Sequence, residues 1–120
     1  MKKSLPWACA AVLAVQASFS FAADGARGQQ LYESRCIGCH SIEDNRAGPA
    51  HKGVFGRKAG MAKGFDYSPA LKSSKLIWNE RTLDRWLTNP EATIPGQKMG
   101  FAVPDSLDRA DLIEYLRGAK

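Results

Sequence analysis

Five consecutive residues place two thiols and an imidazole side by side: Cys36, Ile37, Gly38, Cys39 and His40. Two cysteines separated by two residues can each bond a vinyl group of one haem, and a histidine directly after them can then bind the haem iron. The spacing therefore predicts one covalently attached haem c. Cys36 and Cys39 are its predicted attachment points, and His40 is a predicted ligand of the iron.

Redox and zinc chemistry are the alternatives for a pair of cysteines at this spacing. A thioredoxin-like dithiol is typical of a βαβ context, and a structural zinc ion needs further ligands at matching intervals. The chain offers one other histidine, His51, and one other cysteine, Cys9, and neither lies at such an interval. Both alternatives also leave the histidine beside the second cysteine unexplained, so the haem interpretation is preferred.

A methionine is the candidate for the opposite side of the iron, where the sixth position is either filled by the protein or left open. A neutral thioether favours ferrous iron and raises the reduction potential relative to a second imidazole. Met61 lies in a loop rich in glycine and lysine, whereas Met99 follows a rigid Pro-Gly pair. The setting of Met99 has no helical period, which argues against an ordinary core methionine. We therefore predict Met99 as the ligand, with Met61 or an open position as alternatives.

The N-terminal residues are typical of an export signal. A short basic stretch at 2–3 precedes an apolar stretch at 5–17, and small residues follow at 20, 22 and 23. We expect cleavage after Ala22 or Ala23 and export, most simply to the bacterial periplasm, where haem can be joined to thiols in an oxidising compartment. A retained membrane anchor is the alternative, although the apolar stretch is short for a bilayer span.

Cleavage after Ala23 would divide the chain into a signal peptide, 1–23, and one haem domain, 24–120. Two of the 17 basic residues would leave with the signal, so 15 would face 12 acidic residues, a net excess of three. This small excess argues against a nucleic-acid partner and allows at most weak contact with a membrane surface. A domain of this size buries only a modest part of its surface, and the covalently attached haem would supply the apolar core that the polypeptide lacks. We therefore expect the apoprotein to be largely unfolded.

The rest of the sequence predicts an all-α chain, in which helices and long loops wrap around the prosthetic group. Gly28 lies in the first expected helix and allows close approach of another element. A long loop rich in glycine is expected over 41–64. The expected helices cover 24–35, 68–74, 79–89, where Asn89 and Pro90 end the helix, and 105–118.

Six motifs follow one another along the chain: CIGCH at 36–40, AGPAHKGVFGRKAG at 47–60, GFDYSPAL at 64–71, LIW at 76–78, TNPEATIPGQKMGF at 88–101 and DLIEYLRG at 111–118. In this order they resemble the motifs of class I c-type cytochromes, similar to mitochondrial and proteobacterial cytochrome c. The resemblance covers nearly the whole of the predicted domain. It implies the class I cytochrome c fold, with His40 and Met99 as the axial ligands of the iron.

The resemblance also implies what surrounds the haem. The carbonyl of Pro49 would accept a hydrogen bond from the far nitrogen of His40 and so orient the imidazole. Buried propionates need polar partners, because an unpaired charge out of water is costly. The side chains implied at or near the propionates are Arg57, Tyr67, Ser68 and Trp78. Without the resemblance, ordinary core packing of the aromatic residues and a solvated charge on Arg57 would be the simpler interpretations.

Some positions depart from the mitochondrial pattern. Trp86 stands where a tyrosine is common near the methionine sulfur, and an indole can donate but cannot accept a hydrogen bond. Gln97 replaces a usual threonine and Leu71 a usual asparagine, so we expect the haem surroundings to differ. His51 replaces a usual leucine beside the ring. We expect it to be partly solvated or locally hydrogen-bonded rather than a second histidine ligand of the iron.

The implied function is that of a soluble one-electron carrier, not an enzyme, whose iron cycles between Fe(III) and Fe(II). The implied partners are redox proteins with acidic docking patches, such as a quinol-oxidising cytochrome complex, a terminal oxidase or a periplasmic reductase, and the chain is expected to be a monomer. Basic side chains expected to steer these partners are Arg35, Lys52, Lys63, Lys75 and Lys98. The alternatives are a haem c subunit or dedicated electron acceptor of a larger oxidoreductase and, less well supported, a ligand-binding haem enzyme or sensor.

Overall fold

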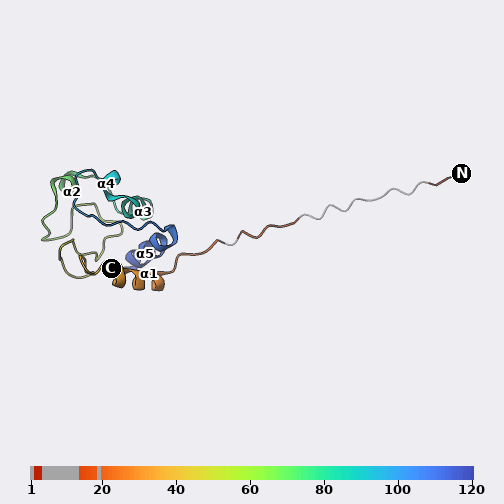
Figure 1. Ribbon diagram of the computed structural model, residues 1–120, viewed down its shortest axis with the longest axis horizontal. Helices are drawn as coiled ribbons and strands as arrows, with labels where there is room; N and C mark the ends of the chain where they lie inside the picture. Colours follow the sequence, from red (N-terminus) through yellow and green to blue (C-terminus); the bar gives the residue numbers. More distant parts are fainter. Residues whose placement is uncertain (1, 4–13, 19) are drawn as a thin grey trace.

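The computed structural model describes residues 2–3, 14–18 and 20–120. Within these residues the chain forms five helices (Figure 1). They are α1 (Gly25–Arg35), α2 (Pro69–Ser73), α3 (Glu80–Thr88), α4 (Pro90–Thr93) and α5 (Ser106–Gly118). Strand-like pairing in the described part is limited to one bridge between Lys58 and Ile77. The predicted all-α class is confirmed.

The expected helices are present and the expected stop at Asn89 and Pro90 is confirmed, but the short helix α4 that follows was not predicted. Asn89 does end α3, and its side chain then accepts a hydrogen bond from the Ala92 amide at 3.0 Å. Pro90 is the first residue of α4, where its fixed φ suits a helix and its missing N–H is not needed. The same two residues therefore end one helix and begin the next.

Polar side chains set where the other helices begin. Asp24 accepts hydrogen bonds from the Ala26 and Arg27 amides at 2.9 and 3.1 Å and so caps α1. At the start of α3, Asn79 and Thr82 each accept a hydrogen bond from the other's backbone amide, at 3.0 and 2.8 Å. These caps determine the residue at which α1 and α3 each begin, and so where each helix meets the preceding segment.

The first and last helices pack closely against each other. A side chain at Gly28 would overlap the carbonyl of Asp111, so glycine is required at this contact. One turn further along α1, the Tyr32 ring lies 5.2 Å from the Tyr115 ring of α5, between centroids. Leu112 and Val103 are the most completely buried large side chains of the described core, at 1% and 0% exposure.

Ion pairs reinforce this helix contact at its edge. Asp108 of α5 binds both Arg27 and Arg35 of α1, and Asp111 binds Arg27 at 2.6 Å. Asp111 also accepts a hydrogen bond from the backbone N–H of Asp24 at 2.7 Å. The Arg27 guanidinium holds the pKa of Asp108 below its usual range, and the Asp24 amide does the same for Asp111. Both carboxylates therefore stabilise the folded state when ionised.

The described residues that precede Asp24, 2–3, 14–18 and 20–23, are exposed. Most of the predicted apolar stretch at 5–17 lies outside the described residues. Residues 20–23 are exposed, and the Phe21 side chain is 89% accessible. Among the described residues, no helix combines the length and the apolar character needed to cross a bilayer. The division into a signal and a haem domain stays a prediction.

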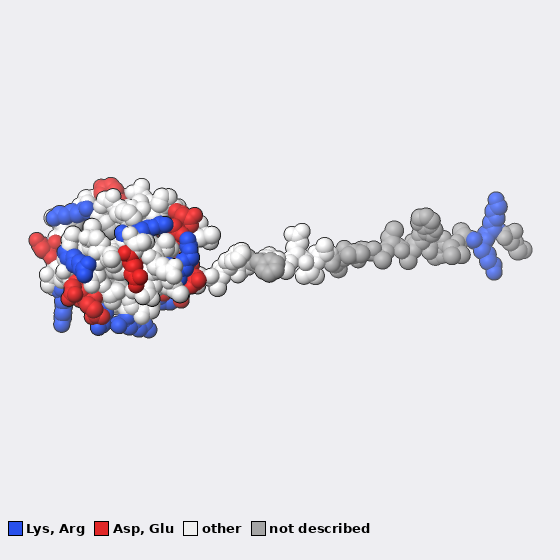
Figure 2. Space-filling model, turned by 60° about the horizontal axis from the view of Figure 1, so that its bottom comes forward, with Lys and Arg blue, Asp and Glu red and all other residues white. Residues whose placement is uncertain are grey.

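The surface of the domain carries both signs of charge. On the face drawn in Figure 2, Lys and Arg side chains are interspersed with Asp and Glu side chains. This mixture agrees with the small net excess calculated for residues 24–120.

Candidate haem-binding site

The helix α1 delivers the two cysteines and the histidine in one tight turn. Cys36 closes the helix, with its amide donating to the Tyr32 carbonyl at 2.8 Å. The amides of Cys39 and His40 both donate to the Cys36 carbonyl, at 3.1 and 2.9 Å. The three chemically active side chains therefore come from one compact turn on a rigid helix end.

The two cysteines of this turn differ in exposure, with Cys36 partly buried and Cys39 exposed. Burial is the main cause that raises the pKa of the Cys36 thiol to about 11. Redox-active dithiols instead lower the pKa of the attacking cysteine, because the thiolate is the nucleophile. This difference argues against the thioredoxin-like alternative.

The His40 ring is oriented by one backbone contact. Its Nδ1 lies 2.9 Å from the Pro49 carbonyl oxygen, which can only accept, so Nδ1 carries the proton. Burial lowers the pKa of His40, which keeps the imidazole neutral. The lone pair of Nε2 is then left for a metal ion, as at other histidine ligands. The hydrogen bond implied by the resemblance is present, while the binding of iron by His40 stays a prediction.

Gly48 lies directly against the same ring. A Cβ atom at this position would lie 2.6 Å from Nδ1 and 2.7 Å from Nε2 of His40, well inside van der Waals contact. The Gly48 amide also donates to the Cys39 carbonyl at 2.7 Å, which ties this loop to the cysteine turn. The absence of a side chain at 48 is therefore what gives the imidazole its place.

His51 stacks on His40, a contact that the sequence did not reveal. The two rings are 4.1 Å apart between centroids and inclined by 22°. His51 Nδ1 lies 2.9 Å from the hydroxyl of Tyr32, so His51 is hydrogen-bonded as expected, although its partner is 19 residues away in the chain. Burial, followed by the charges of His40 and Arg57, lowers the pKa of His51 to about 3. His51 is therefore a neutral, ordered ring beside the predicted iron ligand.

Arg57 has a donor that no protein atom accepts. Its Nη1 and Nη2 atoms donate to the carbonyls of Lys52 and Ala50 at 2.9 and 3.0 Å. Its Nε is buried and lacks a hydrogen-bond partner. A buried donor without an acceptor costs free energy, so we expect an acceptor such as a carboxylate at Nε.

Backbone pairing brings Trp78 next to Arg57. The Trp78 amide donates to the Arg57 carbonyl at 2.9 Å, and the Gly56 amide donates to the Trp78 carbonyl at 2.6 Å. The Trp78 ring is 7% exposed and meets the Trp86 ring edge to face, at 5.2 Å between centroids. Two members of the implied propionate group are thus neighbours, and Trp86 packs against one of them.

Tyr67 and Ser68 have local structural roles. The Tyr67 hydroxyl accepts a hydrogen bond from the Ala62 amide at 2.9 Å, and the Ser68 hydroxyl caps α2 by accepting from the Leu71 amide at 3.2 Å. Both residues are buried. The structure brings them together next to α2, and their contact with a propionate stays a prediction.

A turn of defined geometry leads into Met99. The Gln97 amide donates to the Ile94 carbonyl at 3.2 Å, and Gly96 has φ of +87°, as a type II turn requires after a proline. The Gln97 side chain then accepts a hydrogen bond from the Met99 amide at 2.5 Å. The Gln97 side chain therefore supports the backbone of Met99 directly. Met99 packs against the core, whereas Met61 is 59% exposed.

Arg109 fastens the chain after Met99, a role that the sequence did not reveal. Its Nη1 donates to the carbonyls of Val103 and Pro104 at 2.9 and 2.8 Å. The Val103 amide donates to the Leu87 carbonyl of α3 at 2.7 Å. The segment that follows Met99 is thus tied to both α3 and α5.

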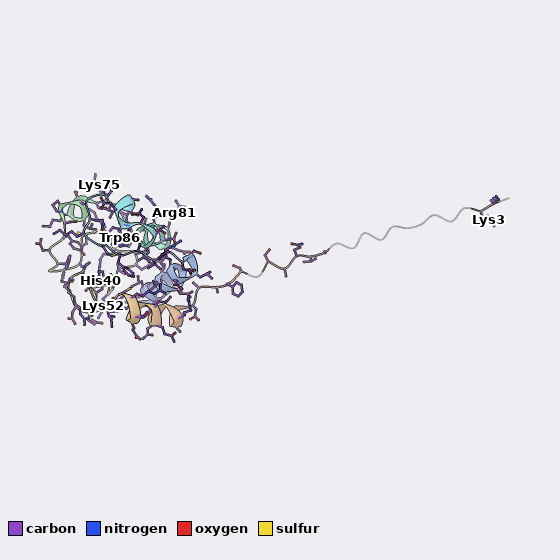
Figure 3. All side chains as sticks on the ribbon, in the orientation of Figure 1. Lys3, His40, Lys52, Lys75, Arg81 and Trp86 are labelled. Atoms are coloured by element: carbon purple, nitrogen blue, oxygen red, sulfur yellow. The ribbon has the colours of Figure 1, made fainter. Side chains whose placement is uncertain are left out.

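These residues fit a covalently bound haem. A cysteine turn offers the thiols, an oriented histidine leaves Nε2 available, and a half-buried thioether stands in a restrained loop. The buried Nε of Arg57 offers a donor for a propionate. Figure 3 places His40 beside the end of the domain that carries α1, with Trp86 on α3. The sequence model of the cytochrome c family matches residues 25–120.

The chain belongs to the cytochrome c family. Similar curated proteins include cytochrome c of Tetrahymena pyriformis, 48% identical over 96 residues, which cover 78% of this chain and 87% of that protein. Cytochrome c2 of Rhodomicrobium vannielii is 42% identical over 110 residues, 88% of this chain and 87% of that protein.

Solved structures show the same family fold. Cytochrome cH from Methylobacterium extorquens superposes with a TM-score of 0.76 and 41% identity, over 79% of this chain and 98% of that chain. Ferricytochrome c2 from Rhodopseudomonas palustris gives a TM-score of 0.75 and 32% identity, over 81% and 99%. This cytochrome c therefore has the predicted class I fold, bears one covalently attached haem c and functions in electron transfer.

Proposed function

We propose that this cytochrome c carries single electrons between redox proteins after export, with its haem joined to Cys36 and Cys39 and the iron held between His40 and Met99. When bound, the haem supplies an iron that can be ferric or ferrous. The observation that carries the proposal is the fixed tautomer of His40, because the Pro49 carbonyl occupies Nδ1 at 2.9 Å and leaves Nε2 for the iron.

The setting of Met99 supports the function of an electron carrier rather than that of an enzyme or a sensor. The Met99 backbone amide is held by the Gln97 side chain and follows a type II turn, so the loop that presents the thioether is restrained. A protein ligand on each side of the iron leaves no position for a substrate and keeps the coordination alike in both oxidation states. Rearrangement on electron transfer is then small.

Replacement of Met99 tests this assignment against a matched methionine. Met99→Leu is expected to lower the reduction potential and to let the ferrous protein bind carbon monoxide. Met61→Leu, at an exposed position, is expected to change neither property. If Met99→Leu left both the potential and carbon monoxide binding unchanged, the axial role of Met99 would be wrong.

We propose that Arg57 lies in the environment of the haem propionates and donates a hydrogen bond to one of them. Its buried Nε has no protein acceptor, and Trp78 is held next to it by backbone hydrogen bonds. Arg57→Lys would keep a charge but lose the fork of donors that bridges Lys52 and Ala50. We expect this variant to lower the reduction potential, which a redox titration measures, because a less well-compensated propionate favours ferric iron.

Of the expected docking residues, two are already engaged within the domain. Arg35 pairs with Asp108 at 2.9 Å and Lys52 pairs with Glu43 at 3.1 Å. Lys63, Lys75 and Lys98 are exposed and form no ion pair among the described residues. These three lysines are the better candidates for steering acidic partners.

Charge reversal at one of these lysines tests the partner class. Lys75→Glu is expected to slow reduction by a bacterial quinol-oxidising complex at low salt, and the difference should shrink as salt screens the charges. Lys120→Glu makes the same change in net charge at the C-terminus, which lies beside α1 and away from Lys75 (Figures 1 and 3). Equal slowing by both variants would show that only net charge matters.

A further inference from the structure

His51 connects the first helix to the predicted iron ligand. Its ring lies almost parallel to that of His40, with 4.1 Å between centroids and 22° between planes. Its Nδ1 is 2.9 Å from the hydroxyl of Tyr32, a residue of α1 that is only 3% exposed. The chain of contacts thus runs from α1 through Tyr32 and His51 to His40.

A leucine at this position could not make these contacts. It could fill the space, but it has no flat face to lie on an imidazole and no nitrogen for the Tyr32 hydroxyl. A buried hydroxyl without a partner is costly, so Tyr32 and His51 depend on each other. Their combination is a hydrogen-bonded polar pair beside the His40 ring.

The other contacts of His40 leave its ring plane incompletely fixed. The hydrogen bond from Nδ1 to Pro49 directs one edge of the ring, and Gly48 packs closely against the ring atoms. A single hydrogen bond still permits the imidazole ring to rotate about the axis of that bond. A second ring stacked at 4.1 Å restricts that motion, provided that it is itself held in place.

We propose that Tyr32 and His51 form a positioning pair that sets the plane of the His40 imidazole above the haem iron. His51 acts on the iron ligand by stacking, and Tyr32 acts through His51. The pair rests on the proposed role of His40 as an axial ligand. Because the ring plane of an axial imidazole governs its overlap with the iron orbitals, the pair also tunes the reduction potential.

The test compares four variants of the haem-loaded protein: Tyr32→Phe, His51→Leu, the double variant and Tyr115→Phe. Haem methyl proton shifts of the ferric protein report the orientation of the axial imidazole, and a redox titration gives the potential. Tyr115→Phe is the matched control, because the Tyr115 ring also packs on Tyr32, at 5.2 Å between centroids, but forms neither a ring contact nor a hydrogen bond with His51 in the described part of the chain. Visible spectra of every variant establish that His40 and Met99 still bind the iron.

We expect Tyr32→Phe and His51→Leu to alter the spread of the methyl shifts and to move the potential in the same direction, with the larger change in His51→Leu. The double variant should match His51→Leu, because Tyr32 acts only through His51. Tyr115→Phe should keep the wild-type shifts.

Two results would overturn the positioning role. In the first, both Tyr32→Phe and His51→Leu keep the methyl shifts and the reduction potential of the wild type. The pair would then be purely structural, even if both variants were less stable. The other is an equal change in Tyr115→Phe. A wild-type protein whose spectrum is not low-spin would instead contradict the proposed ligation by His40 and Met99. Failure of the positioning role and failure of the ligation can therefore be told apart. If His51→Leu does not mature, Tyr32→Phe still decides the question.

Discussion

Arg109 of α5 donates a hydrogen bond from Nε to the Asp84 carboxylate of α3 at 2.7 Å. The same guanidinium holds the Val103 and Pro104 carbonyls, which follow the loop of Met99. The Arg109 side chain is only 11% exposed. One residue thus joins two helices to the segment that presents the thioether.

Arg109→Ala is expected to lower the free energy of unfolding by about 2 kcal/mol, because it leaves two carbonyls and a half-exposed carboxylate without their donor. Denaturant unfolding of the ferric protein measures the loss, and the visible absorption due to methionine ligation should disappear at lower denaturant than the overall fold does. Lys72→Ala is the control, since it breaks an exposed ion pair with Asp66. A cost as small as that of Lys72→Ala would refute the fastening role of Arg109.

Gly48→Ala is expected to destabilise the holoprotein by about 3 kcal/mol, near the upper end for overpacking, because the added methyl group would overlap the His40 ring. The displaced imidazole should also change the visible spectrum. Gly100→Ala provides the comparison, because a Cβ there meets no atom within 4 Å. Unfolding curves that coincide for the two variants would show that the Gly48 contact is not needed.

Local chemistry accounts for what the sequence predicted well. The caps at Asp24 and Asn79 and the cysteine turn depend on residues a few positions apart, so their patterns can be recognised in one dimension. The loop contact between His40 and Pro49 could be expected only because several motifs together resembled a known family. Of the candidate site, the attachment points and His40 could be predicted from their spacing and Met99 from its setting after a Pro-Gly pair, and their roles stay predictions.

Tertiary contacts account for what the sequence did not reveal. Nothing near His51 in the chain indicates that Tyr32, 19 residues earlier, would supply its hydrogen bond. Arg109 likewise looks like any charged residue of a helix until α3 is placed beside it. The helix α4 was missed for a different reason, because an Asn-Pro pair is a stop signal for one helix and a start signal for the next.

The α1–α5 ion pairs predict how stability depends on pH. The pKa of Asp108 is lowered first by the Arg27 guanidinium and then by Arg35, against the effect of burial, and that of Asp111 is also lowered. A folded-state pKa below the unfolded value of about 3.9 means that the contribution is complete above that value and is lost as the pH falls through the folded-state pKa. We expect the melting temperature to fall steeply below about pH 4.

Asp108→Asn should flatten this acid limb, because the amide cannot titrate, while lowering stability at neutral pH. Thermal unfolding followed by circular dichroism at a series of pH values measures both effects. An acid limb of unchanged slope in Asp108→Asn would show that other carboxylates are responsible.

The predicted cleavage after Ala23 would change a contact of Asp111. Its carboxylate accepts the Asp24 N–H at 2.7 Å, and cleavage would turn this amide into an α-ammonium group. An ammonium at a helix start is unfavourable by itself, so the carboxylate should offset the helix dipole and raise the pKa of the amine. The contribution would then be complete below the ordinary amine pKa of about 7.7 and lost as the pH rises through the higher folded-state value.

Two versions of the protein check this effect. A form that begins at Asp24 should be more stable at about pH 6, by about 1 kcal/mol, than the same form with an acetylated N-terminus, and the difference should vanish at about pH 10. Mass spectrometry of the exported protein establishes which residue comes first. Equal melting temperatures at the lower pH would contradict the ion pair.

The most direct test of the central claim is the visible spectrum of the reduced wild-type protein before and after addition of carbon monoxide at neutral pH. If His40 and Met99 occupy the two axial positions, the spectrum is expected to be low-spin and to remain unchanged with the gas present. A spectrum that shifts promptly on addition of carbon monoxide would show an open position on the iron and would contradict the account.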